Sequence, residues 1–164
     1  MTSVRWLRRN GSGVGTFQIA VPDGWTVRES PGSPVTLLGP EVAGFRASLV
    51  VHGRQLPIEV DLETLAERAL QQGDPDTVVG PVLDRRGGTR PPVAVRRGVA
   101  TAGDRKVVQL VAVIAARSQA PAGLRTVYTL LGTCLLDRAA VDEGGLADTI
   151  GSFRTGPRTD QGEE

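Results

Sequence analysis

Three long apolar segments follow one another in the second half of the chain, and they constrain the fold more than any other feature. They cover residues 93–101, 106–116 and 125–136, and short turn-forming connections separate them. Such connections favour antiparallel neighbours. The middle segment carries apolar residues on both sides, with Val107, Val111 and Val113 on one and Val108, Leu110 and Ile114 on the other. A strand that is apolar on both faces lies between two layers, so we expect 106–116 to be central in an antiparallel sheet.

The N-terminal half predicts shorter strands. Residues 16–21 and 25–29 alternate apolar and polar positions around the turn-forming sequence Pro22-Asp23-Gly24, so we expect them to pair as a hairpin. A third strand is expected at 35–38, ended by Gly39-Pro40. In the next strand, up to Arg54, the odd positions Ala47, Leu49 and Val51 form the core face. The other face is polar, with Arg46, Ser48, His52 and Arg54, and Val50 is its one apolar residue.

Two helices are expected. The first follows Asp61, a plausible N-cap, and repeats apolar residues along one stripe until Gly73 and Pro75 end it; the stripe contains Leu62, Leu65, Ala66, Ala69 and Leu70. The second covers 140–153, with a kink at Gly144-Gly145, and offers four residues to the core: Val141, Leu146, Ile150 and Phe153.

The overall order predicts an α+β domain with an antiparallel sheet, because strands and helices do not alternate as βαβ units. Residues 77–83 are expected to form an edge strand interrupted by Gly80-Pro81, followed by a turn at 85–88. The 164 residues match the length of one domain, which we place at 16–154. Residues 1–15 are expected to be a flexible leader and 155–164 a disordered tail.

The residues that carry most enzyme chemistry are scarce. The chain has one His and one Cys, which exclude a disulfide within the chain and a His- or Cys-rich metal cluster. His52 shares its expected strand face with Ser48, but that spacing corresponds to roughly 13 Å, too far for direct activation of a nucleophile. Cys134 lies in an apolar strand and is expected to be buried and inert. We therefore predict no enzyme, no cofactor and no metal; a hydrolase using His52 is the least favoured alternative.

Basic residues gather between Arg85 and Arg117, where eight cations face a single acid, Asp104. One interpretation is an electrostatic binder of nucleic acid or of an acidic partner through the region Arg85–Lys106. The plainer interpretation is a set of solvated strand ends and hairpin tips. We favour the second, because the stretch contains no aromatic residue on which a base could stack.

The termini and hydropathy predict a location. Arg5, Arg8 and Arg9 are not followed by the apolar run of a secretory signal, and no segment approaches the ~20 apolar residues of a membrane-spanning helix. The expectation is a cytoplasmic protein without membrane attachment.

One short motif supports a family resemblance. Residues 17–25, Phe-Gln-Ile-Ala-Val-Pro-Asp-Gly-Trp, resemble the start of Mog1/PsbP-like domains. These include the actinobacterial LpqN-type proteins and the DcrB-type family, which supplies chaperones for secreted effectors. The strand from Phe45 to Arg54, the helix opened by Asp61 and the closing sequence Ile150–Arg154 follow in a similar order. The resemblance covers about 16–154, and Trp25 is expected to anchor the N-terminal hairpin in the core.

The resemblance implies an α/β/α sandwich around a twisted, mainly antiparallel sheet, and a binding role without shared catalytic apparatus. The anchor cysteine of lipoprotein members and the transit peptide of plastid members are not found, so the cytosolic chaperone or adaptor type fits best. We expect a non-catalytic module for a protein partner, such as a secreted effector or a hydrophobic segment, or for a second copy in a homodimer. Two short helices would leave part of the sheet uncovered for this partner; the alternative is a sheet that the helices and leader cover fully.

Overall fold

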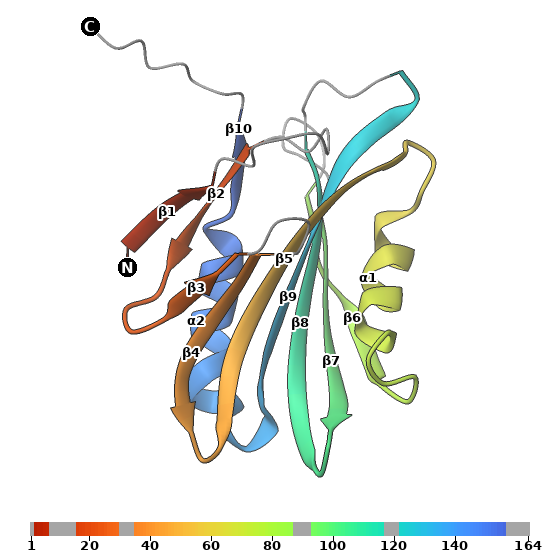
Figure 1. Cartoon of the computed structure of the whole chain (residues 1–164). Coiled ribbons are helices and arrows are strands. Elements are labelled where there is room, and N and C mark those ends of the chain that lie inside the picture. The colour runs from red at the N-terminus through yellow and green to blue at the C-terminus, as the bar shows by residue number, and fades with distance from the viewer. Residues whose placement is uncertain (1, 7–15, 30–34, 87–92, 117–121, 157–164) are drawn as a thin grey trace, which may run out of the picture.

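Two antiparallel sheets and two helices make up the computed structural model, which describes residues 2–6, 16–29, 35–86, 93–116 and 122–156 (Figure 1). The larger sheet has seven strands in the order β3-β4-β5-β9-β8-β7-β6, and the smaller has the order β1-β2-β10. The elements are β1 (Thr2–Trp6), β2 (Thr16–Val21), β3 (Thr26–Arg28), β4 (Val35–Val42), β5 (Phe45–Pro57), α1 (Leu62–Gln71), β6 (Val78–Arg86), β7 (Val93–Ala102), β8 (Arg105–Ala115), β9 (Leu124–Leu135), a 3-10 turn (Leu136–Arg138), α2 (Ala139–Gly151) and β10 (Arg154–Gly156).

The helices lie on opposite faces of the large sheet, α1 on one and α2 on the other (Figure 1). This arrangement confirms the predicted α+β class and the α/β/α sandwich with an antiparallel sheet. Strand β8 lies inside the sheet as predicted, although the middle of the seven positions belongs to its neighbour β9. Both strands are apolar on both faces because each face supports its own core.

The core on the α2 side is the larger one. It joins Ile19 of β2, Leu49 of β5 and Leu130 of β9, each with no exposed surface. Three aromatic rings meet in it, with centroids of Phe17, Tyr128 and Phe153 between 5.2 and 5.7 Å apart. Because Phe17 belongs to the small sheet and Phe153 follows α2, this cluster fastens both elements to the large sheet.

The core on the α1 side is built from the predicted stripe of that helix. Leu62, Leu65, Ala66 and Leu70 pack against the odd-numbered residues of β8 and β9, Val111, Val113 and Val127 among them. Asp61 caps the helix as expected, because its Oδ2 accepts the backbone N–H of Thr64 at 3.0 Å. The helix can approach β7 closely at Gly98, where a Cβ atom would lie 2.9 Å from Thr77 Cγ2 and 3.3 Å from Leu70 Cδ1.

The predicted N-terminal hairpin is wrong, although its turn is present. The backbone N–H of Trp25 donates to the carbonyl of Pro22 at 3.1 Å. After this turn the chain crosses to the large sheet, where β3 pairs with β4, while β2 stays in the small sheet between β1 and β10. Alternation of apolar residues indicates a strand but does not identify its partner, and here each half of the expected hairpin finds another one.

The expected leader also differs from the structure. Thr2–Trp6 forms β1 and pairs antiparallel with β2, from Thr2 opposite Val21 to Trp6 opposite Phe17. At the other end Thr155 and Gly156 belong to β10 and pair with β2, so two residues of the expected tail are part of the fold. Residues 7–15 and 157–164 lie outside the described part of the chain.

Four predictions about these elements need correction. Strand β4 continues past Gly39-Pro40 to Val42, with a register shift between Leu38 and Glu41 that accommodates the proline. Strand β6 continues through Arg85 and Arg86, where a turn was expected. Helix α2 runs without interruption through Gly144-Gly145, and Val141 is 71% exposed, so it does not belong to the core. Leu146, Ile150 and Phe153 pack inward as predicted.

Candidate functional site

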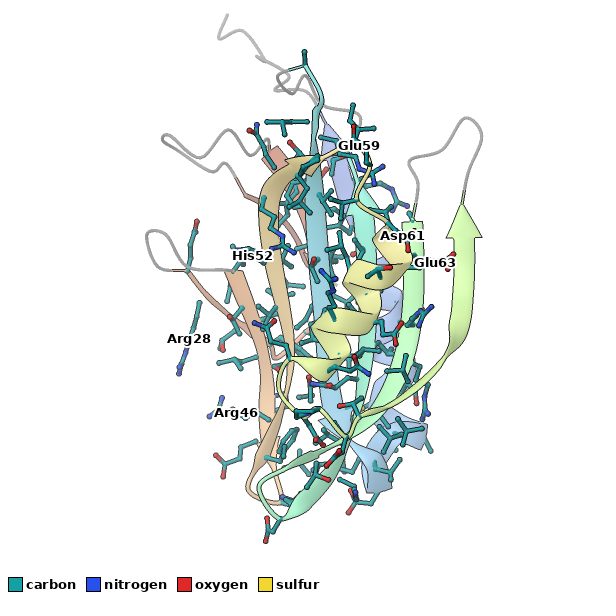
Figure 2. All side chains as sticks on the ribbon, turned by 90° about the vertical axis from the view of Figure 1, so that its right-hand side faces the viewer. Arg28, Arg46, His52, Glu59, Asp61 and Glu63 are labelled. Atoms are coloured by element: carbon teal, nitrogen blue, oxygen red, sulfur yellow. The ribbon has the colours of Figure 1, made fainter. Side chains whose placement is uncertain are left out.

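Helix α1 covers only part of its face of the large sheet. It packs on β6, β7, β8 and β9, and the main helix contacts in the described part of the chain do not include β4 or β5 on this side. Figure 2 looks onto this face, and His52 on β5 lies beside the helix and not beneath it. A groove of about 670 Å³ follows the boundary between helix and uncovered strands. We call it the α1 groove.

The floor of the α1 groove is formed by two paired strands. Val50 of β5 stands opposite Leu131 of β9, and His52 stands opposite Thr129. Leu65 and Ala69 of α1 form the helix side. The floor exists because β5 alternates strictly: Leu49 and Val51 turn into the α2-side core, so Val50 and His52 face the α1 side.

The rim of the groove is polar and positively charged. It is formed by His52, Arg54, Arg68, Gln71 and Gln72, and the ten residues that line the groove include no Asp or Glu. Among the described residues, no carboxylate lies within 4 Å of the guanidinium of Arg54 or Arg68. The groove therefore combines an apolar floor with two arginines whose charge is not compensated locally.

His52 is the residue on which the hydrolase alternative depends. It is exposed on β5, and the side chains around it in the groove include no Asp, Glu, Ser or Cys. Ser48 lies on the same face of β5, four residues before His52, and it does not line the groove. Thr129 is the one hydroxyl-bearing residue of the lining, and the lining offers no carboxylate that would orient the imidazole of His52.

Cys134 is buried, as its position in an apolar strand predicted. Desolvation raises the pKa of its thiol to about 11, and the carboxylates of Asp142 and Glu143 add to the shift. A thiol with a raised pKa is a poor nucleophile because it carries little thiolate near neutral pH. Among the described residues, no three His, Cys, Asp or Glu side chains gather into a set that could hold a metal ion.

The basic stretch does not form one surface in its described part. Arg96 and Arg97 are consecutive on β7 and point to opposite faces of the sheet: Arg96 contacts Glu67 of α1 at 3.3 Å, whereas Arg97 contacts Glu143 of α2 at 2.6 Å. Hydrogen bonding to Glu143 raises the pKa of Arg97 further. Lys106 donates to the hydroxyl of Thr101, and Arg105 donates to the carbonyl of Ala43. Nothing is described of residues 87–92 or of the side chains of Arg85 and Arg86.

A second, smaller cavity lies at the N-terminal end of α2. It has about 110 Å³ and is lined by Trp25, Phe45, Leu135 and the paired side chains of Arg138 and Asp142, with others. Trp25 is half-buried against the α2-side core, so it anchors the start of β3 there and not the expected hairpin. Among the residues described, no helix has the length and apolar character needed to span a membrane.

Two solved structures have a similar architecture over nearly the whole chain. LpqN of Mycobacterium tuberculosis, described as involved in cell envelope biogenesis, superimposes with a TM-score of 0.66 at 16% identity, over 95% of this chain and 91% of that one. The fold is Mog1/PsbP-like. CyanoP, the cyanobacterial PsbP of Synechocystis sp. PCC 6803, superimposes with a TM-score of 0.56 at 14% identity, over 94% and 93% of the two chains.

These likenesses confirm the resemblance that residues 17–25 and the element order had indicated. Identities this low establish the fold and leave the function to be argued from the site. No protein-family model and no curated protein matches the sequence.

Proposed function

We propose that this chain is a non-catalytic protein-binding module, of a chaperone or adaptor type, and that it receives a segment of its partner in the α1 groove. One observation carries the proposal: the sandwich leaves an apolar floor with a polar rim beside α1, where a second covering element would complete the layer. Apolar floors bounded by polar rims are the usual anatomy of a protein interface.

The cellular setting belongs to the same proposal. The module would act in the cytoplasm, on a secreted or otherwise hydrophobic partner. LpqN, which has this fold, takes part in cell envelope biogenesis, and a partner that travels to the envelope would suit a chaperone of this kind. A second copy of the chain is the alternative occupant of the groove, and it would make the functional unit a homodimer.

Site-specific photo-crosslinking in the native host tests this function. A photoreactive residue replaces Gln72, which is exposed at the groove rim, and the matched control replaces Asp104, which is exposed at the tip of the β7–β8 hairpin. We expect one dominant protein adduct from the groove position and none from the hairpin tip. An adduct with the mass of two copies would assign the groove to a homodimer.

A blocking variant supplies the second arm. Ala69→Gln adds a polar side chain to the groove wall, and glutamine is a good helix former. Because Ala69 also packs partly against the α1-side core, circular dichroism and the unfolding temperature check that the variant is folded. The adduct from position 72 should fall in this variant while the chain stays folded. The function proposed would be wrong if both positions gave the same adducts, if neither gave any, or if the blocked groove gave the adduct undiminished.

A further inference from the structure

Two arginines without a carboxylate partner converge on the α1 groove. Elsewhere in the described part of the chain, four arginines lie within 4 Å of a carboxylate: Arg46 with Glu41 at 3.9 Å, Arg96 with Glu67 at 3.3 Å, Arg97 with Glu143 at 2.6 Å and Arg138 with Asp142 at 3.0 Å. Other described arginines, such as Arg28 and Arg105, also have no carboxylate partner, but they lie singly and do not line the groove. Arg54 and Arg68, by contrast, come from the strand side and the helix side of one groove, and neither has a carboxylate partner in the described part of the chain.

From this contrast we infer that the groove takes an acidic amphipathic α-helix of a partner protein, laid beside α1, with carboxylates of that helix meeting Arg54 and Arg68. The inference rests on the proposed function and names the chemistry of its partner. The apolar stripe of the partner helix would contact Val50 and Leu131 on the floor and Ala69 on the wall.

The pairing of β5 bears on how a partner segment can bind at the groove floor. At Val50, β5 is paired with β4 on one side and with β9 on the other, so this part of its backbone offers no edge for an added strand. The described pairing with β4 ends at Val51, and that with β9 continues to Pro57. At the apolar floor only side chains are offered, which is the situation of a helix in a groove. A helix with side chains is about 10 Å wide and strands are about 4.8 Å apart, so one helix covers the width of the two floor strands, β5 and β9.

The lining also decides between an amphipathic and a uniformly apolar helix. Four of its ten residues are apolar, Val50, Leu65, Ala69 and Leu131, and the other six are polar or charged. A uniformly apolar helix would bury the guanidinium groups of the rim without partners, which is costly. Carboxylates placed at the edges of the apolar stripe would instead pair with them, at a solvated rim where such pairs mainly set specificity.

A charge-reversal selection tests the inference. The probe is a phage-displayed library of sixteen-residue helical peptides: its apolar face is fixed as leucine at i, i+3, i+4 and i+7, and its flanking positions vary among Glu, Lys, Gln and Ala. The full-length chain should enrich Glu at the flanks. The double variant Arg54→Glu with Arg68→Glu should enrich Lys at the same positions. The matched control, Arg28→Glu with Arg46→Glu, reverses two exposed arginines on β3 and β5 and should keep the preference for Glu.

The selected peptide, made synthetically, then gives an affinity by fluorescence anisotropy. We expect the groove double variant to bind it roughly tenfold more weakly or worse, and the control variant to bind it as the unaltered chain does. Retained folding of each variant is checked by its circular dichroism and unfolding temperature.

Each other outcome counts against the inference. Enrichment of Lys, no preference at the flanks, no enriched peptide, or a preference unchanged by the double variant would overturn it. So would selective binding of an RNA oligomer or of anionic lipid vesicles that depends on the same two arginines. If Ala69→Gln removes the native adduct at position 72 while Arg54→Glu with Arg68→Glu does not, the proposed function stands and the acidic helix is wrong. If both leave it, the function itself fails.

Discussion

The two faces of the large sheet are built from the same strands and end in different environments. On the α2 side, Leu49 and Val51 of β5 are 0% and 2% exposed, beneath a layer that combines α2 with the small sheet. One position along the same strand, on the α1 side, Val50 is half-buried and His52 is exposed. A ten-residue helix cannot cover seven strands, so the α1 face stays partly open. The comparison teaches that the α2 side is covered over β5, whereas the α1 side has its core beneath the helix and leaves a surface beside it.

The largest effect is expected where the α2-side core is anchored. Phe153→Ala removes one ring of the aromatic cluster and leaves a cavity between α2, β2 and β9, so the free energy of unfolding should fall by about 3–5 kcal/mol. Val141→Ala is the matched control, because Val141 is 71% exposed on α2, and it should change stability by less than about 0.5 kcal/mol. Urea unfolding measures both. Equal losses would show that α2 is not anchored through this cluster.

The next effect compares the faces directly within β5. Leu49→Ala should lower the free energy of unfolding by about 2–5 kcal/mol, since Leu49 is fully buried. Val50→Ala changes the next residue, on the open face, and should cost about 1 kcal/mol or less. Valine has the higher strand propensity of the two, so loss of propensity acts against the expected order, and a larger cost at Leu49 reports the covering layer. A Val50 variant as damaging as the Leu49 variant would mean that the α1 face is closed.

How much of this asymmetry was predictable depends on the range of the interactions. The alternation of Leu49 and Val51 with polar neighbours predicted which face of β5 is buried, and the periodic stripe after Asp61 predicted α1 with its cap. Both patterns are local consequences of strand and helix geometry. Cys134 was expected to be buried for the same reason, because it lies within a long apolar strand.

The errors concern partners that lie far away in the sequence. Nothing in residues 16–21 indicates that β2 pairs with Thr2–Trp6 and with Arg154–Gly156 instead of with its neighbour β3. The groove was not located either, because it joins β5 to a helix and to β9 across long separations. One local signal pointed toward it: Val50 is the single apolar residue on the otherwise polar face of β5.

A smaller effect contrasts thiols on the two faces. Burial raises the pKa of Cys134 to about 11 from an ordinary value of 9.0, and the neutral thiol is the form favoured by folding. The unfolded chain therefore loses this proton first as the pH rises. The stabilisation from Cys134 is complete below about pH 9 and is lost as the pH approaches 11. Cys134→Ala should reduce this loss between pH 9 and 11, measured as the difference in unfolding free energy between the two proteins.

Alkylation by iodoacetamide at pH 8 provides the spatial control. Cys134 should react only when the chain unfolds, whereas a cysteine introduced by Val50→Cys, in a Cys134→Ala background, should react in the folded protein. A slow reaction at position 50 would place the α1 face under cover, and a fast one at Cys134 would open the α2 face.

The smallest effect on stability is expected for the arginines. It distinguishes Arg97, which joins the sheet to α2, from Arg68, which lines the groove. Arg97 joins β7 to α2 through two hydrogen bonds to Glu143, at 2.6 and 3.2 Å, but the two side chains are 37% and 26% exposed, so solvent screens the pair. Arg97→Gln should therefore cost only about 0.5–1 kcal/mol of stability, and Glu143→Gln a similar amount. A double-mutant cycle should return most of that cost as coupling between Arg97 and Glu143.

Arg68→Gln, which breaks no ion pair in the described part of the chain, should leave stability unchanged and alter only binding. A destabilisation by Arg68→Gln as large as that of Arg97→Gln would mean that Arg68 already has a partner within the fold, and the contrast between the two faces would then not extend to their charges.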